Sequence, residues 1–164
     1  MNLRKAFFLS LFLVTLAAMG CRDRCARLDC ANGNCVEGEC VCEAGYEGSL
    51  CETLINEKYS GTYTVEEECV AGSDNYQLTM TPDASNPAQV KISGLWERQD
   101  TVIGNVDDTG LIVTIERQAL GNREVSGTGT SEDQFGLTIQ FTYDIFNTGA
   151  GSPFDNCTAT FNKD

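Results

Sequence analysis

Acidic side chains are the main candidates for chemistry in this sequence, because it contains no histidine. That absence excludes Ser-His-Asp and Cys-His catalysis as well as histidine-based metal sites. Glu97, Glu116 and Asp144 fall in segments with strand-like alternation, so two of them could form the carboxylate pair that glycosidases use. Nothing in their spacing pairs them, and we therefore expect a protein that is not an enzyme and has no catalytic residue.

Two further acidic motifs have structural interpretations. The triplet "DTG" at 108–110 resembles the active site of aspartic proteases, but Asp107 stands where that family has an apolar strand residue, and a hairpin turn is favoured. The run "EEE" at 66–68 could contribute to a calcium site, although the solvated tip of a hairpin is favoured. We accordingly expect no metal site and no cofactor.

Cysteine is the other reactive side chain, and its count of nine is odd, so the cysteines cannot all pair within one chain. Six of them fall within residues 25–51, a segment too small to bury an apolar core, which therefore needs covalent cross-links to fold. These six are Cys25, Cys30, Cys35, Cys40, Cys42 and Cys51. Six cysteines allow fifteen pairings, and spacing alone does not choose among them.

Residues 25–51 resemble an EGF-like module. The resemblance is carried by the single residue between Cys40 and Cys42, by the closing "CEAGYEGSLC", and by the "NG" turn at 32–33. That family pairs its cysteines first with third, second with fourth and fifth with sixth. The resemblance thus implies the bridges Cys25–Cys35, Cys30–Cys40 and Cys42–Cys51, and it disfavours a zinc site.

Cys21, Cys69 and Cys157 then remain. Cys69 and Cys157 most simply pair with each other, which closes a loop of nearly ninety residues. In the chain-entropy model such a bridge stabilises the fold by roughly 4 to 5 kcal/mol. Cys21 is the cysteine left over.

Residues 1–20 have the pattern of a secretory signal, with a basic start at Arg4 and Lys5 and an apolar run of about fourteen residues. This run is shorter than the roughly twenty residues that a membrane-spanning helix needs. The chain is therefore expected to be exported to an oxidising compartment, where disulfides persist.

The segment "LAAMGC" resembles the lipobox of bacterial lipoproteins, from which it departs at Met19. The resemblance implies that Cys21 carries acyl chains of the palmitate type and that the segment 21–24 is a lipid anchor. The membrane would then be one partner, and the protein would lie at the outer membrane or cell surface. Ordinary signal cleavage is the alternative, and it would leave Cys21 as a free thiol or in an intermolecular bridge.

The charge of the chain restricts its other partners. Without residues 1–20 it keeps all 24 acidic residues but only 9 of its 11 basic ones, so its formal charge is −15. This charge disfavours nucleic acid, because phosphate binding needs clustered Lys and Arg. It favours cations or basic proteins as partners, or serves solubility alone.

The elements that would position these residues are β-strands. After a linker at 52–58, residues 59–164 show apolar residues with a period of two, separated by turn signals. In "LTIQFTYDI" the residues expected to point inward are Leu137, Ile139, Phe141, Tyr143 and Ile145. We predict an all-β chain, with the small disulfide-rich EGF-like module followed by an antiparallel barrel or sandwich of about eight strands. Closure of an up-and-down sheet would bring Cys69 next to Cys157.

Two functions remain open for this architecture. "YSGTYTV" at 59–65 is similar to the first strand of lipocalin-like domains, and Trp96 could stack on a sugar or partner, or plug the edge of the core. We expect a non-enzymatic, lipid-anchored surface lipoprotein that acts as an interaction or adhesion module for an unknown protein or glycan. The alternative is lipocalin-like binding of a small ligand, which a cavity inside the barrel would support and a filled interior would oppose.

Overall fold

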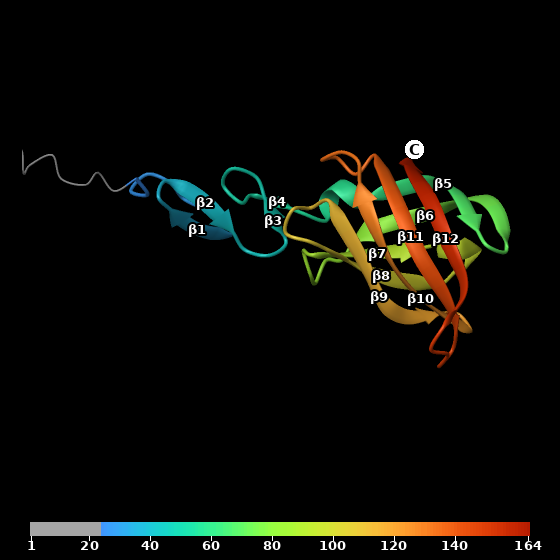
Figure 1. Cartoon of the computed structure of the whole chain (residues 1–164). Helices are drawn as coiled ribbons and strands as arrows, with labels where there is room; N and C mark the ends of the chain where they lie inside the picture. Colours follow the sequence, from blue (N-terminus) through green and yellow to red (C-terminus); the bar gives the residue numbers. More distant parts are fainter. Residues whose placement is uncertain (1–23) are drawn as a thin grey trace, which may run out of the picture.

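The computed structural model describes residues 24–164 of the 164-residue chain. The signal segment and Cys21 lie outside the described residues. The predicted all-β architecture is confirmed, because a small disulfide-rich segment of short strands precedes a closed antiparallel barrel of eight strands (Figure 1). In the described part of the chain, no helix has the length and apolar character needed to cross a membrane.

The disulfide-rich segment, residues 25–51, is held together by three bridges. They join Cys25 to Cys35, Cys30 to Cys40 and Cys42 to Cys51, the same pairs that the sequence resemblance implies. The segment contains a hairpin of β1 (Gly33–Val36) and β2 (Glu39–Cys42), followed by β3 (Tyr46–Glu47), which pairs with β4 (Thr53–Leu54). These short pairings bury little apolar surface, so the disulfides must supply most of the local stability.

The barrel is an up-and-down meander in which each strand pairs with the next and the last returns to the first. Its strands are β5 (Gly61–Cys69), β6 (Gly72–Pro82), β7 (Gln89–Ser93), β8 (Thr101–Val106), β9 (Ile112–Leu120), β10 (Arg123–Ser131), β11 (Thr138–Asn147) and β12 (Pro153–Lys163). Two 3₁₀ turns complete it, η1 (Glu57–Tyr59) before β5 and η2 (Leu95–Glu97) after β7. The open choice between barrel and sandwich is thus resolved in favour of a barrel.

Closure depends on the pairing of β12 with β5. In this pairing Cys157 lies opposite Cys69, and the two form the fourth disulfide, with a sequence separation of 88 residues. The bridge joins the two strands where β5 ends and β12 is near its start. The up-and-down order places these two strands side by side, as the sequence predicted.

The barrel has two different ends. The proximal end lies next to the disulfide-rich segment and carries the β6–β7, β8–β9 and β10–β11 loops, whereas the distal end carries the other four loops (Figure 1). The 3₁₀ turn η1 lies across the proximal end. There the Tyr59 hydroxyl donates to Gly110 O at 2.7 Å, and the Tyr63 hydroxyl donates to Gly136 O at 2.8 Å. Both tyrosines are fully buried, so this end of the barrel is closed.

Residues 52–58, expected to be a linker, are packed on both sides. Ile55 is buried in the barrel core, and the Asn56 amide donates to Gln89 O at 2.8 Å. Lys58 forms an ion pair with Glu47 of the disulfide-rich segment at 2.7 Å, with its side chain only 9% exposed. Residues 52–58, where cysteines become rare along the sequence, therefore form a packed junction between the disulfide-rich segment and the barrel.

Side chains fill the interior of the barrel. Residues with odd numbers on β11 point inward, which confirms the predicted orientation of Ile139, Phe141, Tyr143 and Ile145. Phe141 stacks on Phe161 of β12 with 5.0 Å between the ring centroids. Gly129 makes room for the Phe141 ring, because a Cβ atom at this glycine would lie 2.2 Å from it. Such close packing opposes a ligand cavity at this level of the barrel.

The prediction for Leu137 was wrong. This residue lies before β11 and is 51% exposed. The carboxylate of Asp133 accepts the backbone N–H groups of Phe135, Leu137 and Thr138, and these bonds hold the β10–β11 loop as a turn. The strand begins only after that turn, so the alternation does not extend to Leu137.

Candidate functional site

Two acidic side chains point into the distal end of the barrel. Glu67 on β5 follows the inward-facing Tyr63 and Val65, and Asp155 on β12 precedes the inward-facing Cys157. Their exposed fractions are only 5% and 3%. Strand alternation forces this orientation, because residues two apart lie on the same face.

The interpretation of 66–68 as a solvated hairpin tip was wrong for its central residue. Glu66 and Glu68 are exposed on the outer face, whereas Glu67 is buried. The tip of the β5–β6 hairpin lies farther along, at Val70 and Ala71, between the two strand ends. The three glutamates thus follow the strand period, which separates them onto two faces of the sheet.

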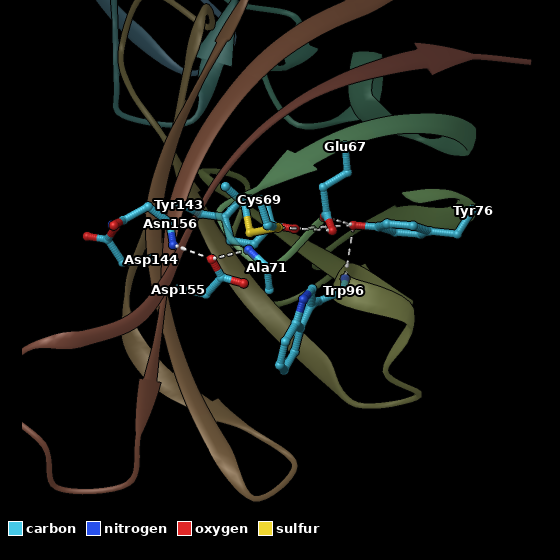
Figure 2. Close-up of a disulfide and its surroundings, with 10 residues drawn as sticks. Glu67, Cys69, Ala71, Tyr76, Trp96, Tyr143, Asp144, Asp155 and Asn156 are labelled. Carbon is cyan, nitrogen blue, oxygen red and sulfur yellow. Dashed lines mark hydrogen bonds between the residues drawn. A yellow bond between two sulfur atoms is a disulfide. The ribbon is translucent and has the colours of Figure 1, made fainter. Parts of the chain in front are cut away.

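One oxygen of the Glu67 carboxylate accepts a hydrogen bond, whereas the other receives no donor from the cysteine beside it. Tyr76 donates its hydroxyl proton to Oε2 at 2.7 Å, while Oε1 lies 3.4 Å from Cys69 Sγ (Figure 2). Because a disulfide sulfur carries no proton, this contact supplies no donor to Oε1. Burial raises the pKa of Glu67, the bond from Tyr76 lowers it in part, and the charges of Asp74, Asp155 and Glu97 raise it further.

Asp155 shows the same asymmetry. Its Oδ1 accepts the backbone N–H groups of Asn156 at 2.9 Å and Ala71 at 3.3 Å. Its Oδ2 is buried and has no hydrogen-bond partner within residues 24–164. A buried carboxylate oxygen without a donor is costly, so its presence at the barrel end requires an explanation.

Tyr76 connects Glu67 to the loop that carries Trp96. Its hydroxyl oxygen accepts the backbone N–H of Trp96 at 3.0 Å and lies 3.4 Å from the Tyr143 hydroxyl on the opposite side of the barrel (Figure 2). Burial and the neighbouring Glu67 carboxylate raise the pKa of Tyr76. Tyr76 therefore stays protonated at neutral pH and can donate to Glu67 while it accepts from Trp96.

Trp96 lies in η2 at the rim of the distal end. Gly94 and Trp96 both have positive φ values, 96° and 54°, and this left-handed backbone turns the chain sharply after β7. The indole is half-buried and packs against the core. The guanidinium carbon of Arg98 lies 5.0 Å from the ring centroid. Trp96 thus lies at the edge of the core, one of the two positions that the sequence allowed, and also offers a face that a cation occupies.

Glu67 and Trp96, but not Asp155 or Tyr76, line a recess of about 320 Å³, which we call the distal recess. Its lining residues are Glu67, Asp74, Trp96, Glu97 and Arg98. Three carboxylates and one aromatic ring surround a single basic group, so the recess is suited to bind a positively charged group.

The other acidic candidates do not join this site. Glu116 and Asp144 lie on the outer face of the barrel, on β9 and β11, with β10 between them. Glu97, in contrast, lines the distal recess. The three residues that could have formed a glycosidase pair are therefore divided between two regions.

The "DTG" triplet forms the β8–β9 hairpin turn, as predicted. Oδ1 of Asp107 accepts the backbone N–H groups of Leu111 and Ile112 at 3.1 and 2.9 Å. Gly110 adopts a φ of 69° and accepts the Tyr59 hydroxyl through its carbonyl oxygen. Asp108 is exposed in this turn, away from the distal recess.

One group of potential metal ligands occurs in the described part of the chain. Ligand atoms of Glu67, Cys69 and Cys157 lie within 4.8 Å of one another. Both cysteines belong to the same disulfide, so they offer no thiolate to a metal. This group is therefore better described as a carboxylate beside a disulfide.

Sequence reasoning did not identify Glu67, Tyr76 or Asp155 as site residues. The signal was present for Glu67, because the alternation that places Tyr63 and Val65 inward continues to residue 67. Asp155 and Cys157 share a face for the same reason. Their proximity to Glu67, however, follows from barrel closure between distant strands and not from local sequence.

No protein-family model matches the chain, and no curated protein matches it. Among solved structures, the chain is similar to one described as the structure of EF1p2_mFAP2b bound to DFHBI. The identity is 14%, the alignment covers 66% of this chain and 95% of that one, and the TM-score is 0.44. A similarity of this degree carries no argument about what the present protein binds.

Proposed function

We propose that this protein is a non-enzymatic, exported binding protein, anchored to a membrane by a lipid on Cys21, which contacts its partner through the distal end of the barrel. The observation that carries this proposal is the difference between the two ends. The proximal end is closed by η1 and the disulfide-rich segment, whereas the distal end presents the distal recess, which the buried carboxylate of Glu67 lines.

The anchor is supported by the cysteine arrangement. The four disulfides of residues 24–164 use eight of the nine cysteines, and the remaining one is Cys21 in the lipobox-like segment. Four disulfides also favour an oxidising compartment. A lipidated Cys21 would account for both the odd count and the apolar segment before it.

The disulfide-rich segment serves as a pedestal in this proposal. Its three bridges have the order of an EGF-like module, and only three residues separate it from Cys21. Three extended residues span about 10 Å, so the segment would lie close to the membrane surface. The barrel would follow through the packed junction, with its distal end directed away from the membrane.

The partner is a protein or a glycan at the cell surface. The formal charge of −15 without residues 1–20 disfavours nucleic acid and favours a partner that presents positive charge. Trp96 at the rim offers the aromatic contact that such interfaces commonly use.

Lipocalin-like binding of a small ligand is the second candidate. The closed eight-stranded barrel and the distal recess favour it. The packed side chains around Phe141 and Phe161 oppose a deep site. A small ligand would therefore bind at the distal recess and not at the centre of the barrel.

The anchor is tested by the intact mass of the protein from its native host, after treatment with a thiol-alkylating reagent with and without reduction. We expect the mass of residues 21–164 plus acyl chains, no alkylation before reduction, and eight alkyl groups after it. An unlipidated mass with one alkyl group before reduction, or a disulfide-linked dimer, would contradict the anchor.

The binding surface is tested with a soluble Cys21→Ala protein, labelled and applied to intact host cells. Trp96→Ala at the distal end should reduce cell binding strongly. Phe135→Ala is the matched control, because Phe135 is 69% exposed in the β10–β11 loop at the proximal end. Equal binding by both variants would argue against the distal end as the contact surface.

A further inference from the structure

We propose that residues 96–98 form a lid at the distal end of the barrel, which stays closed while Glu67 is protonated and opens when Glu67 ionises. The lid carries Trp96, so its position would set how this side chain is presented to a partner. That consequence rests on the proposed function, whereas the movement itself does not.

The lid is anchored at one end and exposed over most of its length. Leu95, the residue before it, is fully buried in the barrel core, and Trp96 is half-buried. Residues 97–100, which lead to the start of β8, are all exposed. Exposed loop segments with few buried contacts open more easily than the strands that they join. The lid could therefore move while the barrel wall stays intact.

The backbone of the lid has a conformation that other contacts must maintain. Trp96 and Glu97 have φ values of 54° and 53°, so two consecutive non-glycine residues lie in the left-handed region. Residues with a Cβ atom are crowded in this region and remain there only where surrounding contacts hold them. Tyr76 supplies such a contact, because its hydroxyl oxygen accepts the backbone N–H of Trp96 at 3.0 Å. Loss of this bond would let the lid backbone relax.

Glu67 is coupled to the lid through Tyr76. Figure 2 shows a chain of contacts that runs from the backbone of Trp96 to the Tyr76 hydroxyl and on to the Glu67 carboxylate. Oε1 of Glu67 lies 3.4 Å from Sγ of Cys69. This sulfur belongs to a disulfide and can only accept, so a hydrogen bond here requires a proton on Oε1. The closed arrangement therefore matches the protonated form of Glu67.

Ionisation of Glu67 would place like charges on two sides of the distal recess. Glu67 lines the recess from the barrel, and Glu97 lines it from the lid. An open lid would admit water to the Glu67 carboxylate and move Glu97 away from it, which favours the ionised form. Arg98 opposes this effect in part, because it is the basic residue of the recess lining. The charged and titratable groups around Glu67 and Tyr76 are Asp74 on β6, Asp155 on β12, Tyr143 on β11, and Glu97 and Arg98 of the lid.

The direction of the pH dependence follows from proton linkage. Burial raises the pKa of Glu67 above its ordinary value of 4.5, the bond from Tyr76 lowers it in part, and the neighbouring carboxylates raise it further. The closed state thus binds the proton more tightly than the open state, in which Glu67 is hydrated. The closed state is favoured at low pH and loses this advantage as pH rises through the pKa of the closed state. We therefore expect the lid to open above pH 4.5.

Trp96 reports on the lid directly, because it is the sole tryptophan of the chain. Soluble Cys21→Ala protein is titrated from about pH 4 to about pH 8, and quenching of its tryptophan fluorescence by acrylamide, an uncharged quencher, is measured at each pH. The quenching constant should rise reversibly with pH as the indole becomes accessible. Each unit by which the closed state raises the pKa of Glu67 changes the ratio of open to closed protein about tenfold. Circular dichroism would establish that the barrel stays folded.

Variants assign the change to the two glutamates. Glu67→Gln keeps an acceptor for Tyr76 but cannot ionise, so its quenching constant should stay low at every pH. Glu97→Gln should show a smaller rise, because the like charge on the lid is removed. Glu116→Gln removes a charge from an exposed position on β9 and is the matched control, which should retain the full rise.

Tyr76→Phe tests the same coupling if Glu67→Gln fails to fold. It removes the hydroxyl that holds the Trp96 backbone, so its quenching constant should be high already at acidic pH. Tyr46→Phe, on β3 in the disulfide-rich segment, is the matched control and should behave like the original protein.

The proposal would be overturned by a quenching constant that does not change with pH, by a full rise in Glu67→Gln, or by low quenching of Tyr76→Phe at acidic pH. These measurements need neither a partner nor a lipid. A failed cell-binding experiment would thus leave the lid in place, and a lid that does not move would leave the distal end available as a contact surface.

Discussion

The amide of Asn56 holds the β6–β7 loop against the proximal end of the barrel. Asn56 is fully buried, and its Nδ2 group lies 2.8 to 3.4 Å from the carbonyl oxygens of Gln89, Asn86 and Asp83. These carbonyls belong to one loop, which also contacts the disulfide-rich segment where Pro87 lies against Gly45. This buried side chain therefore helps to hold the loop in position beside that segment.

Replacement of Asn56 by Ala should lower the free energy of unfolding by about 1 to 3 kcal/mol, because partly buried carbonyl groups would lose their donor. Denaturant titration followed by circular dichroism would measure this loss. Asn122→Ala, in the exposed β9–β10 turn, is the matched control and should change stability little. Similar losses in both variants would show that the Asn56 amide has no special role.

Because the pKa of Glu67 is raised in the folded protein, the free energy of unfolding should depend on pH. Burial and the charges of Asp74, Asp155 and Glu97 raise its pKa in the folded protein, although Tyr76 opposes this. A raised folded pKa means that the folded state binds the proton more tightly than the unfolded state. The associated stabilisation is complete below the unfolded pKa and is lost as pH rises through the folded pKa.

Glu67→Gln should therefore gain in melting temperature relative to the original protein as pH increases from about 4 to about 8. The glutamine keeps an acceptor for Tyr76 but cannot ionise. Paired melting curves across this range test the prediction, with Glu116→Gln as the exposed control. If the difference in melting temperature between Glu67→Gln and the original protein stayed constant with pH, Glu67 would have the same pKa in the folded and unfolded states.

At the scale of elements, β10 and β11 approach each other closely at two glycines. A Cβ atom at Gly129 would lie 2.2 Å from the Phe141 ring, and one at Gly127 would lie 2.4 Å from Cβ of Tyr143. The neighbouring ring of Phe161 stacks on Phe141, so the aromatic pair has little freedom to move. The packing of Phe141 on β11 against Phe161 on β12 thus depends on the absence of a side chain at Gly129 on β10.

Gly129→Ala should destabilise the protein by about 1 to 3 kcal/mol through overpacking. Gly151→Ala is the matched control, because nothing lies within 4 Å of the Cβ position there. Thermal melting of both variants would compare a packed site with an open one. If the two variants melted at the same temperature, the Phe141 ring would have to adjust without cost.

The strand period predicted much of the barrel but not where β11 begins. The inward residues of β11 follow from the alternation of its sequence. The pairing of the first and last strands of the barrel follows from its short connections. Leu137 was assigned wrongly because Asp133 binds three backbone N–H groups, and hydropathy does not reveal such bonds. Glu67 was missed because its charge was taken to indicate solvent exposure, although its position in the strand indicated the interior.

At the scale of the whole molecule, the site arises from barrel closure. Glu67 and Asp155 come from β5 and β12, the first and last strands of the barrel, and lie at the same end of its interior only because these strands pair. No local pattern could place them together before closure was known. Trp96 was identified as a candidate from its type and position, but its partners Glu67 and Tyr76 were not.

The Cys69–Cys157 bridge joins the same two strands. Replacing both cysteines with Ala should lower the melting temperature of the barrel, because the unfolded chain would lose a constraint worth up to about 4 to 5 kcal/mol. Cys157→Ala alone should expose one new thiol, on Cys69, which alkylation followed by mass spectrometry would detect.

The matched change in Cys25 and Cys35 should leave the melting temperature of the barrel nearly unchanged, because that bridge lies within the disulfide-rich segment. Differential scanning calorimetry would separate the two cases. An unchanged melting temperature after removal of the Cys69–Cys157 bridge would mean that strand pairing alone maintains closure.

The direction of β5 has a mechanical consequence. The chain enters the barrel at the proximal end, runs along β5 to Cys69 at the distal end, and is cross-linked there to β12. A pull between a tether on the N-terminal side and a load at the distal end would act along β5. The hydrogen bonds to β6 and β12 lie across this direction and would share the load in shear, instead of breaking one after another as in unzipping. The barrel is therefore arranged to resist tension applied along β5, from its proximal to its distal end.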